Sequence, residues 1–299
     1  MSVRISWIAS AAVAVLLVGC TSDEKKGPSL DQQVKQAHAL SDVGLRARKL
    51  ADVGAKQVLA GDVIAGESTL NAAAENAEQV EDLGSRANTL IIVGQSMAKA
   101  GKLSEAKKVF REAAKALEGV TEAPAKARAL ADLGTAVGVQ LKNPDAAIEH
   151  LRNAEQAAEK IERPDTKAEV YGKIMVAYHK AENPTEAAAT LAKATAFVEG
   201  LMEPREKVEA SAELGAALAK SGKTDDASKV FKDAEKIAAD IKEDGPRAYA
   251  LLALGKKVKA AGRGEAAHDL FTKADDIAHK IKDSSIKGPL QADIQAAKK

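Results

Sequence analysis

Cysteine and aromatic residues are scarce in this sequence. The 299 residues include one cysteine, and phenylalanine, tryptophan and tyrosine together make up 3% of the chain. A single cysteine excludes a disulfide within the chain, so stability must come from packing. With few aromatic side chains, that packing must rely on alanine and aliphatic residues. A composition rich in alanine, aliphatic residues, lysine and glutamate is typical of an all-helical protein.

Neither sign of charge is in excess. The chain has 44 lysines and arginines against 43 acidic residues, and residues 1–19 contain one of the cations, Arg4, and no acid. Without that segment the two signs are equal. Nucleic-acid-binding domains usually carry a basic excess. We therefore expect no nucleic-acid partner.

The chain also lacks an apolar run long enough to cross a bilayer as a helix, which takes about 20 residues. The longest such run extends from Ala9 to Val18 and is interrupted only by Ser10. Arg4 precedes the run and Gly19 follows it. A charged start, a short apolar middle and a small residue at the end form the layout of a secretory signal peptide.

The only cysteine directly follows this run. Leu17-Val18-Gly19-Cys20 resembles the lipobox of bacterial lipoproteins. The resemblance implies cleavage before Cys20, a diacylglyceryl group on its thiol and an acyl chain on its new amino group; no other cofactor is expected. Thr21 in place of aspartate implies an outer-membrane lipoprotein facing the periplasm in a bacterium with two membranes. With one membrane, the outer face of the cytoplasmic membrane is implied. An ordinary signal peptide with an incidental Cys20 is the alternative interpretation.

A repeat of about 40 residues occupies most of the chain. Six short motifs lie 40, 40, 41, 40 and 40 residues apart, and their last positions are Gly54, Gly94, Gly134, Met175, Gly215 and Gly255. A small residue follows twelve or thirteen residues later, then a large apolar residue after four more. Alanine comes three residues after that, as Ala73, Ala113, Ala154, Ala194, Ala234 and Ala274. A period of this length is the mark of a solenoid.

Each unit predicts two helices joined by a tight turn. Apolar residues in the first half recur at helical spacing, as in Leu90, Val93 and Met97. Glycine at the turn, as at Gly222, can take the left-handed conformation that ends a helix. Asn143-Pro144 and Asn183-Pro184 replace this glycine in the third and fourth units. We expect a second group of prolines to end the second helices: Pro124, Pro164, Pro204 and Pro246.

The offsets within a unit resemble those of the tetratricopeptide repeat. Gly94, Ala106, Phe110 and Ala113 match that family's glycine, alanine, large apolar residue and alanine. The resemblance implies an all-α, right-handed α-solenoid of six helix pairs with short capping helices. The usual unit of that family has 34 residues, and HEAT-type repeats of similar length to this one are the alternative.

The expected organisation follows from these patterns. We expect a lipoprotein signal peptide at 1–19, a tether from Cys20 at 20–29, repeats at 30–283 and a C-terminal cap at 284–299. The units should cover about 47–86, 87–126, 127–167, 168–207, 208–247 and 248–283. Residues 30–42 should cap the first unit, and Pro289 should begin a final short helix.

No motif predicts catalysis, a metal or a nucleotide. Ser221-Gly222-Lys223-Thr224 ends like a phosphate-binding loop, but Ala217 stands where that motif needs its first glycine. The five histidines show no pair at the spacing of a metal-binding helix. We therefore expect a protein that is not an enzyme and binds no nucleotide.

The remaining candidate site is the groove that first helices line in tetratricopeptide proteins. Carried over by resemblance, the groove residues are Arg48, Asn88, Ile91, Gln95, Arg128, Thr135, Gly138, Glu169, Val176, His179, Glu209, Ala212, Tyr249 and Lys256. With the other carried-over positions, such as Ala51, Ala55 and Val58, the groove is mostly small and apolar with charged residues at its edges, which suits a helix of a partner protein. Alternatively, its alanines only pack the first helices together.

The expected function is that of a lipid-anchored scaffold in the cell envelope. Such a scaffold would bind an unidentified envelope protein or peptide, in support of envelope or outer-membrane assembly, and reach the membrane through its lipid. The alternatives are a structural spacer without a specific partner and a small-ligand carrier or enzyme.

Overall fold

The computed structural model describes residues 27–299, and this part of the chain is helical throughout. It contains fourteen α-helices and no strand. The helices are α1 (Leu30–His38), α2 (Val43–Leu59), α3 (Val63–Glu78), α4 (Leu83–Lys99), α5 (Leu103–Glu118), α6 (Ala123–Gln140), α7 (Pro144–Glu159), α8 (Pro164–Lys180), α9 (Pro184–Glu199), α10 (Pro204–Lys220), α11 (Thr224–Ala239), α12 (Asp244–Ala260), α13 (Gly264–Lys280) and α14 (Ser284–Lys298). The lipobox and Cys20 lie outside the described residues.

Six helix pairs, from α2–α3 to α12–α13, confirm the predicted all-α array of helix pairs. Each first helix begins about four residues before the predicted start of its unit. Local capping explains two of these starts, because Asp42 and Asp82 accept hydrogen bonds from the backbone N–H of Leu45 (2.5 Å) and Ser85 (2.7 Å). The unit boundaries predicted from the sequence followed the tetratricopeptide motif. The first position of that motif lies inside the first helix and not at its start.

The prolines between units have a different role from the predicted one. Pro124, Pro164 and Pro204 occupy the first or second position of α6, α8 and α10. Proline is favoured there because its missing N–H would have no partner in the first turn of a helix. These prolines therefore begin the first helices and do not lie at the ends of the second ones.

The turns within the pairs are left-handed, as predicted. Gly222 has a φ of 78°. In the third and fourth pairs the corresponding residues are Lys142 (φ 49°) and Glu182 (φ 60°), just before the Asn-Pro sequences. Thus the backbone turn is the same in all units, although a residue with a side chain is less stable in this conformation than glycine.

The small and large positions of the repeat fit together as the spacing predicts. A Cβ atom added to Gly215 would lie 2.4 Å from Phe231 Cε1, and one added to Gly94 would lie 2.5 Å from Phe110 Cε1. The fourth pair has the opposite arrangement. Met175 is buried in place of the glycine, whereas its partner Leu191 is only partly buried. Glycine thus makes the room that the large side chain of the second helix fills.

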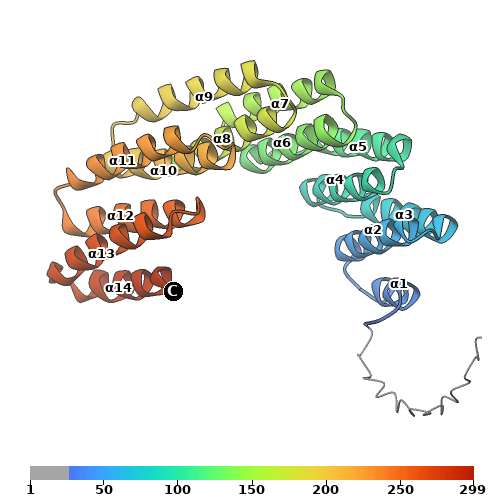
Figure 1. Cartoon of the computed structure of the whole chain (residues 1–299), viewed down its shortest axis with the longest axis horizontal. Coiled ribbons are helices and arrows are strands. Elements are labelled where there is room, and N and C mark those ends of the chain that lie inside the picture. The colour runs from blue at the N-terminus through green and yellow to red at the C-terminus, as the bar shows by residue number, and fades with distance from the viewer. Residues whose placement is uncertain (1–26) are drawn as a thin grey trace, which may run out of the picture.

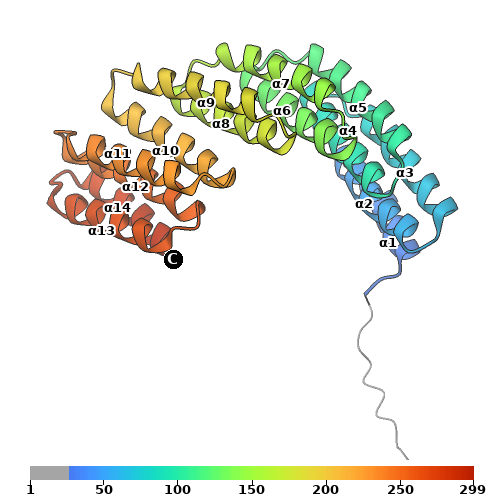
Figure 2. The same cartoon turned by 45° about the horizontal axis from the view of Figure 1, so that its top comes forward.

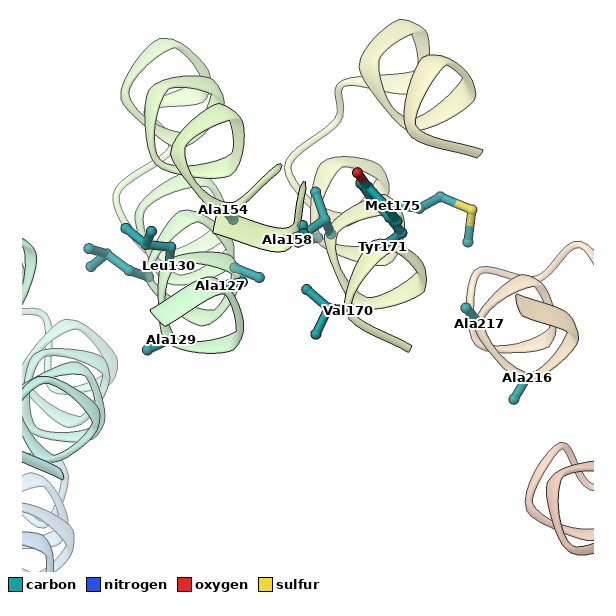
Figure 3. Packing of buried hydrophobic residues seen from close by; sticks show 14 of the residues in the cluster. Ala127, Ala129, Leu130, Ala154, Ala158, Val170, Tyr171, Met175, Ala216 and Ala217 are labelled. Atoms are coloured by element: carbon teal, nitrogen blue, oxygen red, sulfur yellow. The ribbon is translucent and has the colours of Figure 1, made fainter. Parts of the chain in front are cut away.

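Alanines form the rest of the interface between helices. The predicted alanine of every second helix is buried, from Ala73 to Ala274. Figure 3 shows Ala127, Ala154 and Ala158 beside the larger Val170 and Tyr171, where α6, α7 and α8 meet. Small side chains let the helix backbones approach closely, and the larger ones fill the remaining space.

Helices α1 and α14 cover the two ends of the repeat array. Ala37 of α1 packs against the first pair, and Leu290 and Ile294 of α14 are fully buried against the last. The final helix does not begin at Pro289, because Asp283 caps it and Pro289 lies inside it. The side chain of Asp283 accepts a hydrogen bond from the Ser285 N–H (2.9 Å) and therefore fixes the start of α14 five residues earlier than predicted.

The array is curved into an arch. Consecutive first helices contact each other from α2 to α12, whereas the second helices have no comparable contacts with one another within residues 27–299. Figures 1 and 2 accordingly show α5, α7 and α9 on the outside of the arch and α1 and α14 at its two ends. The first helices form its inner layer.

Candidate functional site

The candidate site is the exposed side of the first helices, called the inner face below. In α4, for example, the side chains that remain at least partly exposed include Asn88, Ile92, Gln95 and Lys99. Their spacing of three and four residues places them on one side of the helix. The other sides are covered by the neighbouring first helices and by second helices. Such continuous surfaces are where solenoid proteins typically bind partners.

Two predicted groove residues are not on this surface. Ile91 and Ala212 are 3% and 1% exposed, because their side chains pack between helices. They cannot contact a partner without disrupting the fold, so the structure corrects the prediction at both positions. The same repeat position is buried in α6 and α12 as well, at Ala131 and Leu252. This row of side chains packs first helices together, as the alternative interpretation had it.

Gly138 is also packed more closely than the groove prediction implied. A Cβ atom on Gly138 would lie 2.6 Å from Ala181 Cβ of the next unit. Gly138 lines a cavity of about 540 Å³ at the turns of the third and fourth pairs. The other lining residues are Val139, Lys142, Pro144, Lys180, Ala181 and Glu182. This position therefore lies at one edge of the inner face.

The other groove residues are accessible to different degrees. Exposed side chains belong to Arg48, Asn88, His179 and Lys256. Half-buried ones belong to Gln95, Arg128, Thr135, Glu169, Val176, Glu209 and Tyr249. Most of these side chains are polar, so the accessible part of the inner face is more polar than the predicted small, apolar groove.

Ion pairs connect neighbouring first helices across the inner face. Arg128 of α6 donates to Glu169 of α8, with a distance of 3.0 Å between Nε and Oε2. One turn further along, Lys173 Nζ lies 2.7 Å from Asp132 Oδ2. The hydrogen bond to Glu169 raises the pKa of Arg128 above its ordinary value. The charges that the sequence suggested for the groove edge are thus partly used to join adjacent units.

The most buried of these carboxylates is Glu213 of α10. Burial raises its pKa above the ordinary value for glutamate, and the negative charges of Glu169 and Asp165 act in the same direction. Lys257 of α12 opposes this shift, since its Nζ lies 2.6 Å from Glu213 Oε1. An acidic cluster between α8 and α10 is therefore partly neutralised by cations from the helices on either side.

Tyr249 and Arg205 form the aromatic part of the inner face. The Arg205 guanidinium lies 5.8 Å from the centre of the Tyr249 ring, and its Nε lies 2.8 Å from Glu209 Oε1. Because Arg205 and Tyr249 belong to α10 and α12, this contact also bridges two units. A cation over an aromatic ring adds about 0.5–1 kcal/mol at an exposed site.

Sequence analysis missed a set of crevices on the outer face. Three of these crevices lie between second helices and have volumes of about 380, 530 and 390 Å³. Each is lined by a leucine of a first helix, in the same order Leu90, Leu130 and Leu251. In the fourth unit Tyr171 takes the position of Leu130 and is buried. The recurrence of leucine at the same repeat position could have indicated these sites. Their depth depends on how far the second helices diverge, which the sequence does not state.

His150 lies in the largest of these crevices and is only partly exposed. Burial lowers its pKa below the ordinary value for histidine, and Glu149 opposes the shift. The side chain is therefore mainly neutral at pH 7. Within residues 27–299, no group of three or more histidine, cysteine or acidic residues is placed to hold a metal ion. In the same part of the chain, no helix is long and apolar enough to cross a membrane.

Fold and site together define an all-α helical-repeat protein, a class typical of protein-interaction scaffolds. No protein-family model and no curated protein matches the sequence. Among solved structures, the chain is similar to Ton1535 from Thermococcus onnurineus NA1, with 13% identity over 87% of this chain and 94% of that one, at a TM-score of 0.39.

Two further solved structures also show low identities and TM-scores. BtubC (BKLC) from P. vanneervenii is 18% identical over 71% of this chain and 92% of that one, at a TM-score of 0.39. A Rap protein complexed with Competence and Sporulation Factor is 16% identical over 90% of this chain and 79% of that one, at a TM-score of 0.34. Because the identities and TM-scores are low, these similarities do not indicate a function, which must be inferred from the chain's own residues.

Proposed function

We propose that this chain is a lipid-anchored scaffold of the cell envelope that binds another protein through its inner face. The chief support is the uninterrupted surface that the first helices present. Its exposed and half-buried side chains come from every unit of the arch and together carry both charges, amides and an aromatic ring. A partner with complementary charges can bind along several units at once, which favours specificity.

The anchor in this proposal is Cys20. Leu17-Val18-Gly19-Cys20 supports cleavage and lipid attachment, and Thr21 supports an outer-membrane protein facing the periplasm where two membranes exist. In a bacterium with one membrane, the same anchor holds the protein on the outer face of the cytoplasmic membrane. The bound partner is then an envelope protein or peptide, and the scaffold supports envelope assembly without catalysis and without a cofactor other than its lipid.

Cys20→Ser is expected to abolish anchoring. Without the thiol no diacylglyceryl group can attach, and several acyl chains together hold a protein far more firmly than one. The variant should appear uncut, or should be found in the soluble fraction, when cells are fractionated and the protein is detected by immunoblotting. Ser22→Ala, two residues away, is the control and should stay in the membrane fraction. A Cys20→Ser protein that fractionates and migrates like the wild type would show that the lipoprotein proposal is wrong.

A further inference from the structure

Large apolar side chains are exposed together at the turns of the first two helix pairs. Ile64 is 86% exposed and Leu59 70%, and they lie on either side of the α2–α3 turn. Val63 (42%) and Leu103 (49%) begin α3 and α5. These four residues are called the apolar edge below. Exposed apolar side chains that are gathered in one place, unlike scattered ones, mark a surface that binds something.

The fold itself does not require apolar residues at these positions. At the repeat position of Ile64, the later units have Ser104, Asp145, Thr185, Asp225 and Glu265. At the position of Leu59 they have Lys99, Val139, Lys180, Lys220 and Ala260. The same turn therefore forms with polar, charged or smaller apolar side chains. The apolar edge is a property of the units nearest the N-terminus and not of the repeat.

The register of α1 places its first residue near the level of this edge. Helix α1 packs on α2 in the way that the C-terminal half of a second helix does, with Ala37 at the repeat position of Ala77. Leu30, its first residue, thus corresponds to Leu70, seven residues into α3. At 1.5 Å per residue, Leu30 lies about 10 Å from the level of the turns.

The segment between Cys20 and Ser29 is short. Nine residues reach at most about 30 Å. A lipid on Cys20 therefore keeps the first unit close to the membrane surface. The first two helix pairs, which are nearest to this anchor in the sequence, are the ones that carry the apolar edge.

We infer that the apolar edge rests in the interfacial layer of the same lipid bilayer that holds Cys20. This inference depends on the proposed lipid anchor. The contact is mainly apolar, since two of the nearby lysines already have partners in the protein: Lys102 pairs with Glu67, and Lys56 Nζ lies 2.7 Å from Asp52 Oδ2. With two attachments, the lipid and the edge, the arch has a fixed orientation, and its later units extend from the membrane with the inner face accessible.

The experiment uses the scarcity of cysteine. A full-length, lipidated chain carries no free thiol when Cys20 is acylated, so an introduced cysteine is the only site for a fluorescent maleimide. Ile64→Cys places the dye on the apolar edge, and Thr185→Cys places it at the same repeat position of the fourth unit. Each protein is reconstituted through its own anchor into phosphatidylethanolamine–phosphatidylglycerol vesicles that contain nitroxide-labelled lipid. Circular dichroism checks that both variants are folded.

Nitroxide lipid should quench the dye at position 64 by about twofold or more and leave the dye at position 185 almost unchanged, because only an interfacial side chain meets the lipid. Equal quenching at the two positions would overturn the inference. A dye at position 64 that is shielded from water but not quenched would also overturn it, and would indicate a second copy or another protein on the edge. Labelling of the wild-type chain with the maleimide is a separate result: it would show a free Cys20 and contradict the lipid anchor itself.

Discussion

Phe231→Ala should lower the free energy of unfolding by about 3–5 kcal/mol, the usual cost of removing a buried phenylalanine. Phe231 is 5% exposed and fills the space beside Gly215, where α10 and α11 meet. Alanine would leave a cavity that rigid neighbouring helices cannot close. Because each unit of a solenoid contacts only its neighbours, the loss should be concentrated in α10–α11 and the adjacent units, α8–α9 and α12–α13.

Leu191→Ala is the matched comparison for this substitution. Leu191 occupies the same repeat position in the fourth pair but is only partly buried, because Met175 fills that interface. Its truncation should cost about 1 kcal/mol, a typical value for a single substitution. Circular dichroism melts give the overall difference, and hydrogen exchange locates it. Equal losses in the two variants would mean that the small–large register does not determine the packing.

Gly215→Met is the second change with a large expected effect. Any side chain at this position meets Phe231, since even a Cβ atom would lie 2.4 Å from the ring. Such overpacking usually costs about 1–3 kcal/mol and occasionally more. Adding Phe231→Leu creates the pair found in the fourth unit, Met175 with Leu191, and should recover part of the loss.

Denaturant unfolding of the single and double variants measures this coupling. We expect a favourable interaction of about 0.5–3 kcal/mol between the two substitutions, as for residues in direct contact. Gly264→Ala is the control, because no atom lies within 4 Å of the Cβ it would add, and its effect should be within about 0.5 kcal/mol. Strictly additive losses at positions 215 and 231 would contradict the described contact.

The helix pairs could be predicted because their determinants recur at a fixed spacing. The glycine of a first helix and the phenylalanine of the second are sixteen residues apart, as in Gly215 and Phe231. The residues of one interface are therefore close enough in sequence to be recognised together. The ends of the helices were less predictable. Pro164, for example, fits both the end of one helix and the start of the next, and only the observed backbone shows that it begins α8.

The candidate site was predicted less well, because it depends on how units are placed against each other. The partner of Arg128 is Glu169, one unit away, and the partner of Glu213 is Lys257 in the following unit. Neither pair follows from the pattern within a unit. Ile91 and Ala212 were assigned to the groove by the family's repeat positions, but the close contact of consecutive first helices buries both. The spacing that predicts a helix face does not predict how much of that face a neighbouring helix covers.

The central claim is that a partner protein binds the inner face. Asn88 of α4 and Lys256 of α12 are exposed there, so Asn88→Glu with Lys256→Glu changes the charge of the face without disturbing buried contacts. Lys108→Glu with Lys232→Glu is the control on the second helices α5 and α11, where both lysines are exposed; it changes the net charge by −4, against −3 for the inner-face pair. The three anchored proteins, including the wild type, are isolated from detergent-solubilised membranes, and the amount of the partner that copurifies in fixed ratio with the wild type is measured.

Two misplaced charges in a complementary interface should weaken binding by about 1.4 kcal/mol or more, which is a tenfold or greater loss of affinity. The expected result is therefore a strong reduction of the copurified partner for Asn88→Glu with Lys256→Glu, and recovery at the wild-type amount for Lys108→Glu with Lys232→Glu. Equal recovery from all three proteins, each folded by circular dichroism, would contradict binding through the inner face, and the lack of any stoichiometric partner would contradict the scaffold itself.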